Sequence, residues 1–171
     1  MSSYIKLIIF ILVLLLISAA ILFIDSSVDN MNELMPVISE NIVNGDKDYN
    51  DAVNLVNDKN YAEAMKKATS AGNNYNSSLS KLNILKDKFT PDVNLVHKQY
   101  INNTINEVEL KLLAVENLKE AIGCFQIEYN YTGTNYGYEA NTYMDQSLEY
   151  RDARDSLVTQ NPNMFKQNFI I

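Results

Sequence analysis

The sequence predicts an all-α protein in which a single N-terminal transmembrane helix precedes an elongated antiparallel four-helix bundle. Three observations lead to this fold class. The first is one long apolar run near the N-terminus, from Leu7 to Ile24. The second is that apolar side chains recur every three or four residues along most of the remaining chain, as in amphipathic helices. The third is the scarcity of turn formers, because 5 glycines and 3 prolines in 171 residues are too few to connect many short strands.

The N-terminal run is long enough to cross a bilayer once. It contains 18 uncharged residues, of which 15 are Leu, Ile, Val or Phe. At about 1.5 Å per residue it spans roughly 27 Å, close to the thickness of a bilayer's hydrocarbon core. Lys6 precedes the run and Asp25 follows it, and positive residues tend to stay in the cytoplasm. We therefore expect a cytoplasmic stub and membrane anchor over residues 1–25, and a domain outside the cell membrane over residues 26–171.

A cleavable signal peptide is the alternative for the same segment. Ser18-Ala19-Ala20 fits the small-residue pattern of a cleavage site. Cleavage there would leave an apolar new N-terminus, because the run continues from Ile21 to Ile24. The uncleaved single-pass anchor is therefore the favoured prediction.

The composition excludes some partners. The net charge is −7, and the 14 basic residues form no cluster, so a nucleic acid backbone would be repelled and no nucleic acid partner is expected. The single cysteine, Cys124, has no second cysteine in the chain with which to form a disulfide. Packing must therefore hold the fold together.

The first amphipathic segment after the anchor carries apolar residues at helical spacing, namely Val28, Met31, Met35, Ile38 and Ile42. Asn44-Gly45 is expected to end it, with Gly45 as a left-handed C-cap. Pro36 either kinks this helix or marks the first turn of a shorter one that begins near Met35. A short separate helical segment is expected over residues 48–57, followed by a turn at Asp58-Lys59-Asn60.

Two long helices are expected next, over residues 60–88 and 92–122. Thr90-Pro91-Asp92 predicts the start of the second, with Thr90 as N-cap and Pro91 at the first helical position. Its core positions repeat every seven residues, at Ile101, Val108, Val115, Ile122 and Tyr129. Similar lengths and a short connection predict that the two helices form an antiparallel hairpin.

The segment from Tyr131 to Tyr138 contains two glycines and three tyrosines and is expected to be a loop. Helical spacing returns near Tyr138 and stops at Asn161-Pro162. The tail after Pro162 is too apolar for a free terminus, so we expect it to pack onto the bundle through Met164, Phe165, Phe169, Ile170 and Ile171.

Catalytic and metal-binding patterns are weak in this sequence. Cys124 and His97 are each unique, but on one helix they would lie about 40 Å apart, too far for a catalytic pair. Cys124 is expected to be a half-buried apolar residue, and His97 is expected to have a solvated or packing role. Asp46, Asp48 and Asn50 imitate the opening of a calcium loop, but the sixth and twelfth positions do not fit. A further acidic set, Asp145, Glu149 and Asp152, is interpreted as a solvated face, and no metal or cofactor is expected.

The tyrosine-rich segment is the best candidate for a binding site, through Tyr131, Tyr136 and Tyr138. Tyrosine offers an apolar face and a hydroxyl, which suit a protein or glycan partner. The alternative is that these rings close the end of the bundle. Three N-glycosylation patterns would matter in a domain outside the cell, at Asn76, Asn102 and Asn130.

Richness in Asn, Ile, Lys and Tyr together with one N-terminal span resembles small N-terminally anchored surface proteins of AT-rich microbes, especially methanogenic archaea. The resemblance lies in composition and carries no motif. The leading function is a non-enzymatic interaction or sensing module held at the membrane. The alternatives are a carbohydrate-active or hydrolytic enzyme that uses carboxylates, and an architectural subunit of a membrane complex.

Overall fold

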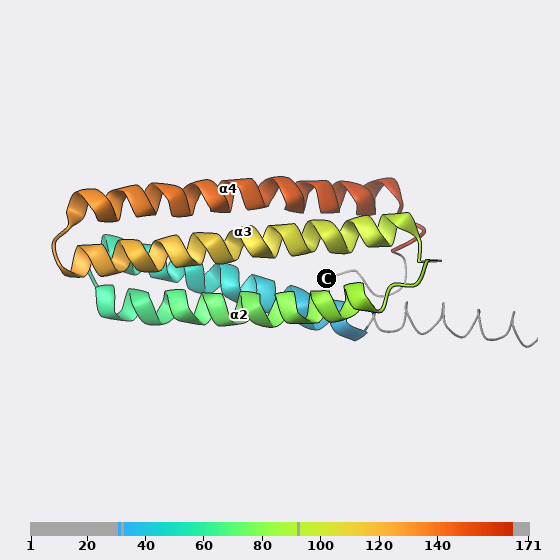
Figure 1. Cartoon of the computed structure of the whole chain (residues 1–171), viewed down its shortest axis with the longest axis horizontal. Coiled ribbons are helices and arrows are strands. Elements are labelled where there is room, and N and C mark those ends of the chain that lie inside the picture. Colours follow the sequence, from blue (N-terminus) through green and yellow to red (C-terminus); the bar gives the residue numbers. More distant parts are fainter. Residues whose placement is uncertain (1–30, 32, 92, 166–171) are drawn as a thin grey trace, which may run out of the picture.

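The computed structural model describes residues 31, 33–91 and 93–165 (Figure 1). Within these residues the chain forms four helices: one over residues 33–57, α2 (Tyr61–Asp87), α3 (Leu95–Gln126) and α4 (Asn130–Gln160). The predicted all-α class and the four-helix bundle are therefore confirmed. The proposed span from Leu7 to Ile24 lies outside the described residues. Of the helices that are described, none has the length and apolar character needed to cross a membrane.

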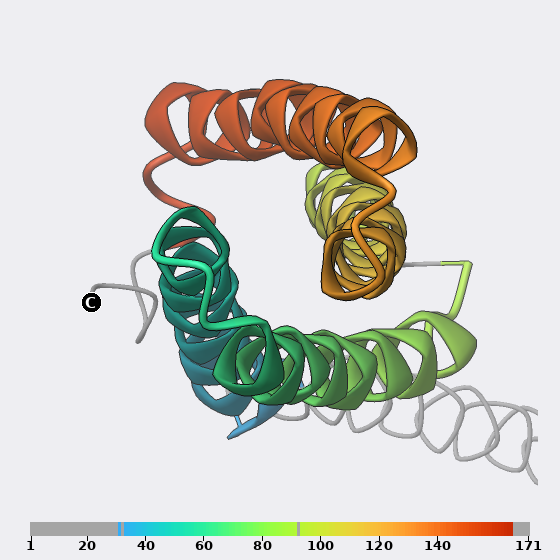
Figure 2. The ribbon, with the colours of Figure 1, turned by 90° about the vertical axis from the view of Figure 1, so that its left-hand side faces the viewer.

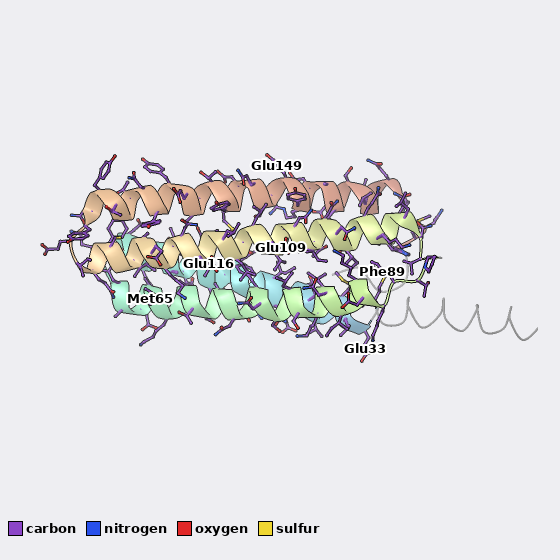
Figure 3. The ribbon with its side chains drawn as sticks, in the orientation of Figure 1. Glu33, Met65, Phe89, Glu109, Glu116 and Glu149 are labelled. Carbon is purple, nitrogen blue, oxygen red and sulfur yellow. The ribbon has the colours of Figure 1, made fainter. Side chains whose placement is uncertain are left out.

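The helices run antiparallel in chain order and enclose one core. Seen end-on, the 33–57 helix lies beside α2, α2 beside α3, and α3 beside α4 (Figure 2). The turns at 58–60 and 127–129 share one end of the bundle, which we call the distal end (Figure 1). The end of α2, the start of α3 and the end of α4 lie at the opposite, proximal end (Figure 1). Figure 3 places Glu33 and Phe89 at the proximal end.

The 33–57 helix is continuous, so the predicted break at Asn44-Gly45 is wrong. Gly45 is buried in the middle of this helix, where a Cβ atom would come within 2.5 Å of the Tyr75 ring of α2. The glycine therefore serves close packing and not a left-handed cap. Residues 31 and 33–35 are already helical, so Pro36 lies inside the helix, where its side chain is exposed.

The turn predicted at residues 58–60 and the helix predicted after it are both confirmed. α2 begins at Tyr61 and ends at Asp87, one residue inside each predicted limit. Its buried side chains follow the helical period. They are Ala64, Ala68, Ala71, Tyr75, Ser78, Leu82 and Leu85.

The start of α3 was predicted a few residues too early. The side chain of Asn94 accepts a hydrogen bond from the backbone nitrogen of Val96 at 2.8 Å, so Asn94 is the N-cap. The Thr90 hydroxyl, predicted to cap, is buried and has no hydrogen-bond partner among the described residues. The seven-residue core repeat is confirmed at four positions, Ile101, Val108, Val115 and Ile122. It fails at Tyr129, which is exposed in the turn after α3.

α4 packs against the bundle through small side chains. Its buried residues are Gly133, Ala140 and Ser147, which are spaced by seven. Leu148, the residue after Ser147, is 38% exposed. The helix ends at Gln160, as Asn161-Pro162 predicted.

The tail begins to dock as predicted. Phe165 is buried against the rings of His97 and Tyr100, with ring centroids 5.4 and 5.3 Å away. Met164 remains partly exposed. Phe169, Ile170 and Ile171 lie outside the described residues.

Candidate functional site

The tyrosine-rich segment is helical, so the predicted loop from Tyr131 to Tyr138 is wrong. The connection between α3 and α4 occupies residues 127–129, and α4 begins at Asn130. Glu128 takes a left-handed backbone conformation with φ of 63° and reverses the chain. Gly133, which was read as a sign of a loop, has a packing role. A Cβ atom there would lie 2.8 Å from the Phe125 ring of α3.

The structure places the tyrosines at the distal end of the bundle, where the first turns of α4 begin (Figure 1). Four large side chains are strongly exposed within twelve residues: Ile127 at 62%, Tyr129 at 64%, Tyr131 at 82% and Tyr138 at 69%. We call these four residues the distal patch. Tyr136, which was predicted to belong to the site, is half-buried. The rings of Tyr131 and Tyr138 therefore do not plug the end of the bundle.

An apolar hollow of about 220 Å³ adjoins the distal patch at Tyr138. The 33–57 helix lines it with Tyr49 and Val53, α3 with Leu118 and Phe125, and α4 with Gly137 and Tyr138. It was not predicted, because its lining combines residues of α3 and α4 with residues of the 33–57 helix, which is distant in the sequence.

Tyr49 brings a buried polar group to the wall of this hollow. Its hydroxyl has no hydrogen-bond partner among the described residues. Burial and the nearby charge of Asp145 raise the pKa of Tyr49 to about 12, so the phenol stays neutral.

The three predicted glycosylation sites differ in how they are placed. Asn76, Asn102 and Asn130 are all exposed. The hydroxyl residues of the first two patterns are not available, because Ser78 and Thr104 are fully buried. Asn130, whose partner residue Thr132 is exposed, is the one site of the three with both residues accessible.

Cys124 and His97 lie near opposite ends of α3, as expected, and the structure does not bring them together. Cys124 is half-buried, and His97 packs on Phe165 with its Nε2 3.2 Å from the Met164 carbonyl oxygen. In the described part of the chain, no group of three His, Cys, Asp or Glu residues could hold a metal ion. Asp145, Glu149 and Asp152 are exposed on α4, as a solvated face requires.

Asp46 and Asp48, the two acidic residues of the calcium-like set, form ion pairs within the bundle. Asp48 accepts hydrogen bonds from Lys67 at 2.8 Å and from Ser70 at 2.6 Å. Burial alone would raise the pKa of Asp48, but these two partners outweigh it and lower the pKa below its usual value. Asp46, whose side chain is 40% exposed, belongs to a second set of charges.

This second set is a buried charge network that the sequence interpretation missed. Lys111 of α3 contacts Asp46 at 2.7 Å and Glu107 at 2.9 Å, and Glu107 contacts Arg154 of α4 at 2.7 Å. Tyr75 of α2 donates a hydrogen bond to Asp46 at 2.6 Å. The network thus joins all four helices. Its members are Asp46, Tyr75, Glu107, Lys111 and Arg154.

The network explains the protonation of its buried members. Burial and the charge of Asp46 raise the pKa of Tyr75, so the phenol stays a hydrogen-bond donor. Burial would lower the pKa of Arg154, but the charge of Glu107 outweighs it and raises the pKa. One sequence signal pointed to this network. Lys111 stands three residues after Val108 and four before Val115, where an apolar core residue is expected.

Comparison with known protein families, with curated proteins and with solved structures finds no match to this chain.

Proposed function

We propose that the chain is a membrane-anchored, non-enzymatic interaction module whose distal patch binds a protein partner outside the cell. The observation that carries this proposal is the grouping of Ile127, Tyr129, Tyr131 and Tyr138 as exposed side chains at one end of the bundle. Exposed apolar groups that gather in one place mark interaction sites, and tyrosine is enriched in protein interfaces.

The position of the patch supports the anchored arrangement. Glu33, which follows the proposed span in the sequence, lies at the proximal end (Figure 3), and α4 begins at the other end, beside the patch (Figure 1). An anchor formed by Leu7 to Ile24 would therefore hold the bundle by the end remote from the patch. A partner would approach the patch from outside without contact with the bilayer.

A protein partner is favoured over a glycan because the site is more apolar than a sugar requires. Ile127 and the apolar hollow of about 220 Å³ beside Tyr138 would accept an apolar side chain. Sugars instead need several convergent polar groups around an aromatic face. Within the described residues, the lining of the hollow is mainly aliphatic, aromatic or glycine.

The enzymatic alternative receives less support from the arrangement of carboxylates. Asp46 and Glu107 do converge, as a hydrolytic site would require, but they do so on the ammonium group of Lys111. Glu107 also pairs with Arg154. Both carboxylates are therefore taken up by ion pairs within the bundle and do not form a pair that is free to flank a substrate.

The experiment uses intact cells that express the full chain with a photo-crosslinking residue in place of Tyr138. We expect a discrete protein adduct at this position and none when the same residue replaces Ile84, an exposed side chain of α2. Protease added outside the cells should degrade the domain. The crosslinked protein, once purified, should bind the full chain directly.

The matched variant is Tyr131→Ala with Tyr138→Ala, because these two rings are the most exposed of the patch. The free energy of unfolding of this double variant should stay within about 0.5 kcal/mol of the parent protein's value, as at ordinary surface positions. Binding to the purified partner should be lost. Unchanged binding by a folded double variant would refute the proposal, and binding to a glycan array alone would assign the patch to sugars.

A further inference from the structure

Both arginines of the chain line one groove. The sequence has 14 basic residues, of which only Arg151 and Arg154 are arginine. They face a groove of about 410 Å³ between the 33–57 helix, α3 and α4, on the proximal side of the hollow described above. Arginine is the side chain best suited to bind a carboxylate through two parallel hydrogen bonds. Its restriction to this groove in a lysine-rich chain indicates a specific use.

The guanidinium group of Arg154 already pairs with side chains of the same chain. It contacts Glu107 at 2.7 Å and Asp155 at 3.2 Å, and it lies 6.0 Å from the centre of the Tyr100 ring. These contacts fix Arg154 in the wall of the groove and neutralise its charge.

The guanidinium group of Arg151 is accessible to a ligand in the groove. Arg151 lies one helical turn before Arg154, and its side chain is 45% exposed. Its one ion pair among the described residues is with the neighbouring Asp152 at 3.5 Å, which is beyond the length of a good hydrogen bond. The guanidinium group therefore keeps donors that an incoming anionic group can use.

Asp46 stands on the opposite wall, on the 33–57 helix. Tyr75 and Lys111 donate to its Oδ1 atom at 2.6 and 2.7 Å, and Lys111 donates to Oδ2 at 2.9 Å. A carboxylate has about four acceptor sites, so one remains. The side chain is 40% exposed, and its orientation is fixed by contacts from two other helices.

We propose that this groove binds a small zwitterion, with the ligand's carboxylate on Arg151 and its ammonium group on Asp46. A ligand that carries both charges can pair with both walls, because Arg151 offers a cation on one wall and Asp46 offers an anion on the other. Met35, Ile42 and Val158 supply apolar surface between the charged walls. The volume lies within the usual range of small-molecule sites. Free amino acids and betaines belong to this chemical class.

The test is isothermal titration of the full chain in detergent with a panel of L-amino acids and glycine betaine. We expect at least one compound to bind with a Kd of about 1 mM or tighter. Its N-acetyl form lacks the cation and its amide lacks the carboxylate, and each should bind at least about tenfold more weakly. An N-acetyl form that binds as tightly as its parent would overturn the role of Asp46. Absence of binding by every compound at about 5 mM would overturn the site.

Arg151→Gln is the matched variant, because Arg151 is exposed and its loss should leave the fold intact. It should weaken binding of the zwitterion at least about tenfold, which corresponds to one lost charge-assisted contact. The control is Lys66→Gln, which removes an exposed cation of α2 that pairs with Glu63. The proposal is overturned if Arg151→Gln binds as the parent does, or if Lys66→Gln weakens binding equally. It is independent of the distal patch, whose variants should bind the zwitterion normally.

Discussion

Two helical glycines, Gly45 within the 33–57 helix and Gly123 in the last turn of α3, should respond in opposite directions to the same substitution. In the 33–57 helix, a Cβ atom on Gly45 would lie 2.5 Å from Cε1 of Tyr75. That ring is fully buried and cannot move easily, because Asp46 holds its hydroxyl at 2.6 Å. At Gly123 of α3, a Cβ atom would meet nothing within 4 Å.

We therefore expect Gly45→Ala to destabilise the protein by about 1 to 3 kcal/mol, the usual cost of overpacking a core. Gly123→Ala should stabilise it by about 0.5 to 1 kcal/mol, because alanine loses less backbone entropy in a helix. Urea denaturation monitored by circular dichroism gives both values. If Gly45→Ala proved as stable as Gly123→Ala, the close approach of Tyr75 to Gly45 would be wrong.

Gly45 and Gly133 show why the role of a glycine was misinterpreted from the sequence. A glycine either adopts a positive φ or leaves space for a neighbour, and both uses look alike in the sequence. Gly45 and Gly133 leave space for Tyr75 and Phe125 respectively. The rings are supplied by other helices, so the reason for the glycine becomes visible only once the helices are packed.

At the scale of elements, the two distal turns share one geometry. After the 33–57 helix, Lys59 has φ of 59°, and the backbone nitrogen of Asn60 donates to the Leu55 oxygen at 2.8 Å. After α3, Glu128 has φ of 63°, and the nitrogen of Tyr129 donates to the Cys124 oxygen at 2.9 Å. Both turns are Schellman motifs, in which the left-handed position usually holds glycine.

Lys59→Gly and Glu128→Gly should therefore each stabilise the protein by about 1 kcal/mol, because a side chain in the left-handed conformation is strained. Both residues are exposed, so little packing is lost. The control is Glu120→Gly in the interior of α3, which should cost roughly 0.7 kcal/mol through lower helix propensity. The measurement is the free energy of unfolding in urea. Destabilisation at all three positions would show that the turns carry no strain.

Helix prediction succeeded where large apolar residues keep a regular spacing. The α2 limits and the α3 core from Ile101 to Ile122 followed from this period alone. The start of α4 was missed because its buried face is made of small residues, Gly133, Ala140 and Ser147. Small residues bring helices close together but give almost no hydrophobic signal, and two glycines in eight residues favoured a loop.

At the scale of the whole molecule, the candidate sites were predicted unequally. The exposed tyrosines at the end of the bundle followed from the order of the helices and the aromatic composition. The arginine groove and the buried network did not, because their residues come from positions more than a hundred residues apart, such as Asp46 and Arg154, and meet only through packing. Lys111 is 3% exposed and Glu107 is 1% exposed, yet each looks like an ordinary helix charge in the sequence.

The buried network gives the last prediction, Lys111→Met. Methionine keeps much of the volume of lysine but removes the one cation that contacts both Asp46 and Glu107 among the described residues. Removing one partner from a buried ion pair leaves an uncompensated charge and typically costs about 3 to 5 kcal/mol. We expect a loss near the lower limit, because Glu107 keeps Arg154 and Asp46 keeps Tyr75.

A second substitution separates charge from packing. Adding Asp46→Asn to Lys111→Met removes the stranded charge while the amide oxygen still accepts from Tyr75, so about 1 kcal/mol or more should be recovered. Lys66→Met is the surface control and should change the free energy of unfolding by at most about 0.5 kcal/mol, because its pair with Glu63 is exposed. If Lys111→Met changes the free energy of unfolding only slightly, or if adding Asp46→Asn recovers none of the loss, then the charges of the network do not determine the packing of the four helices, and side-chain shape does.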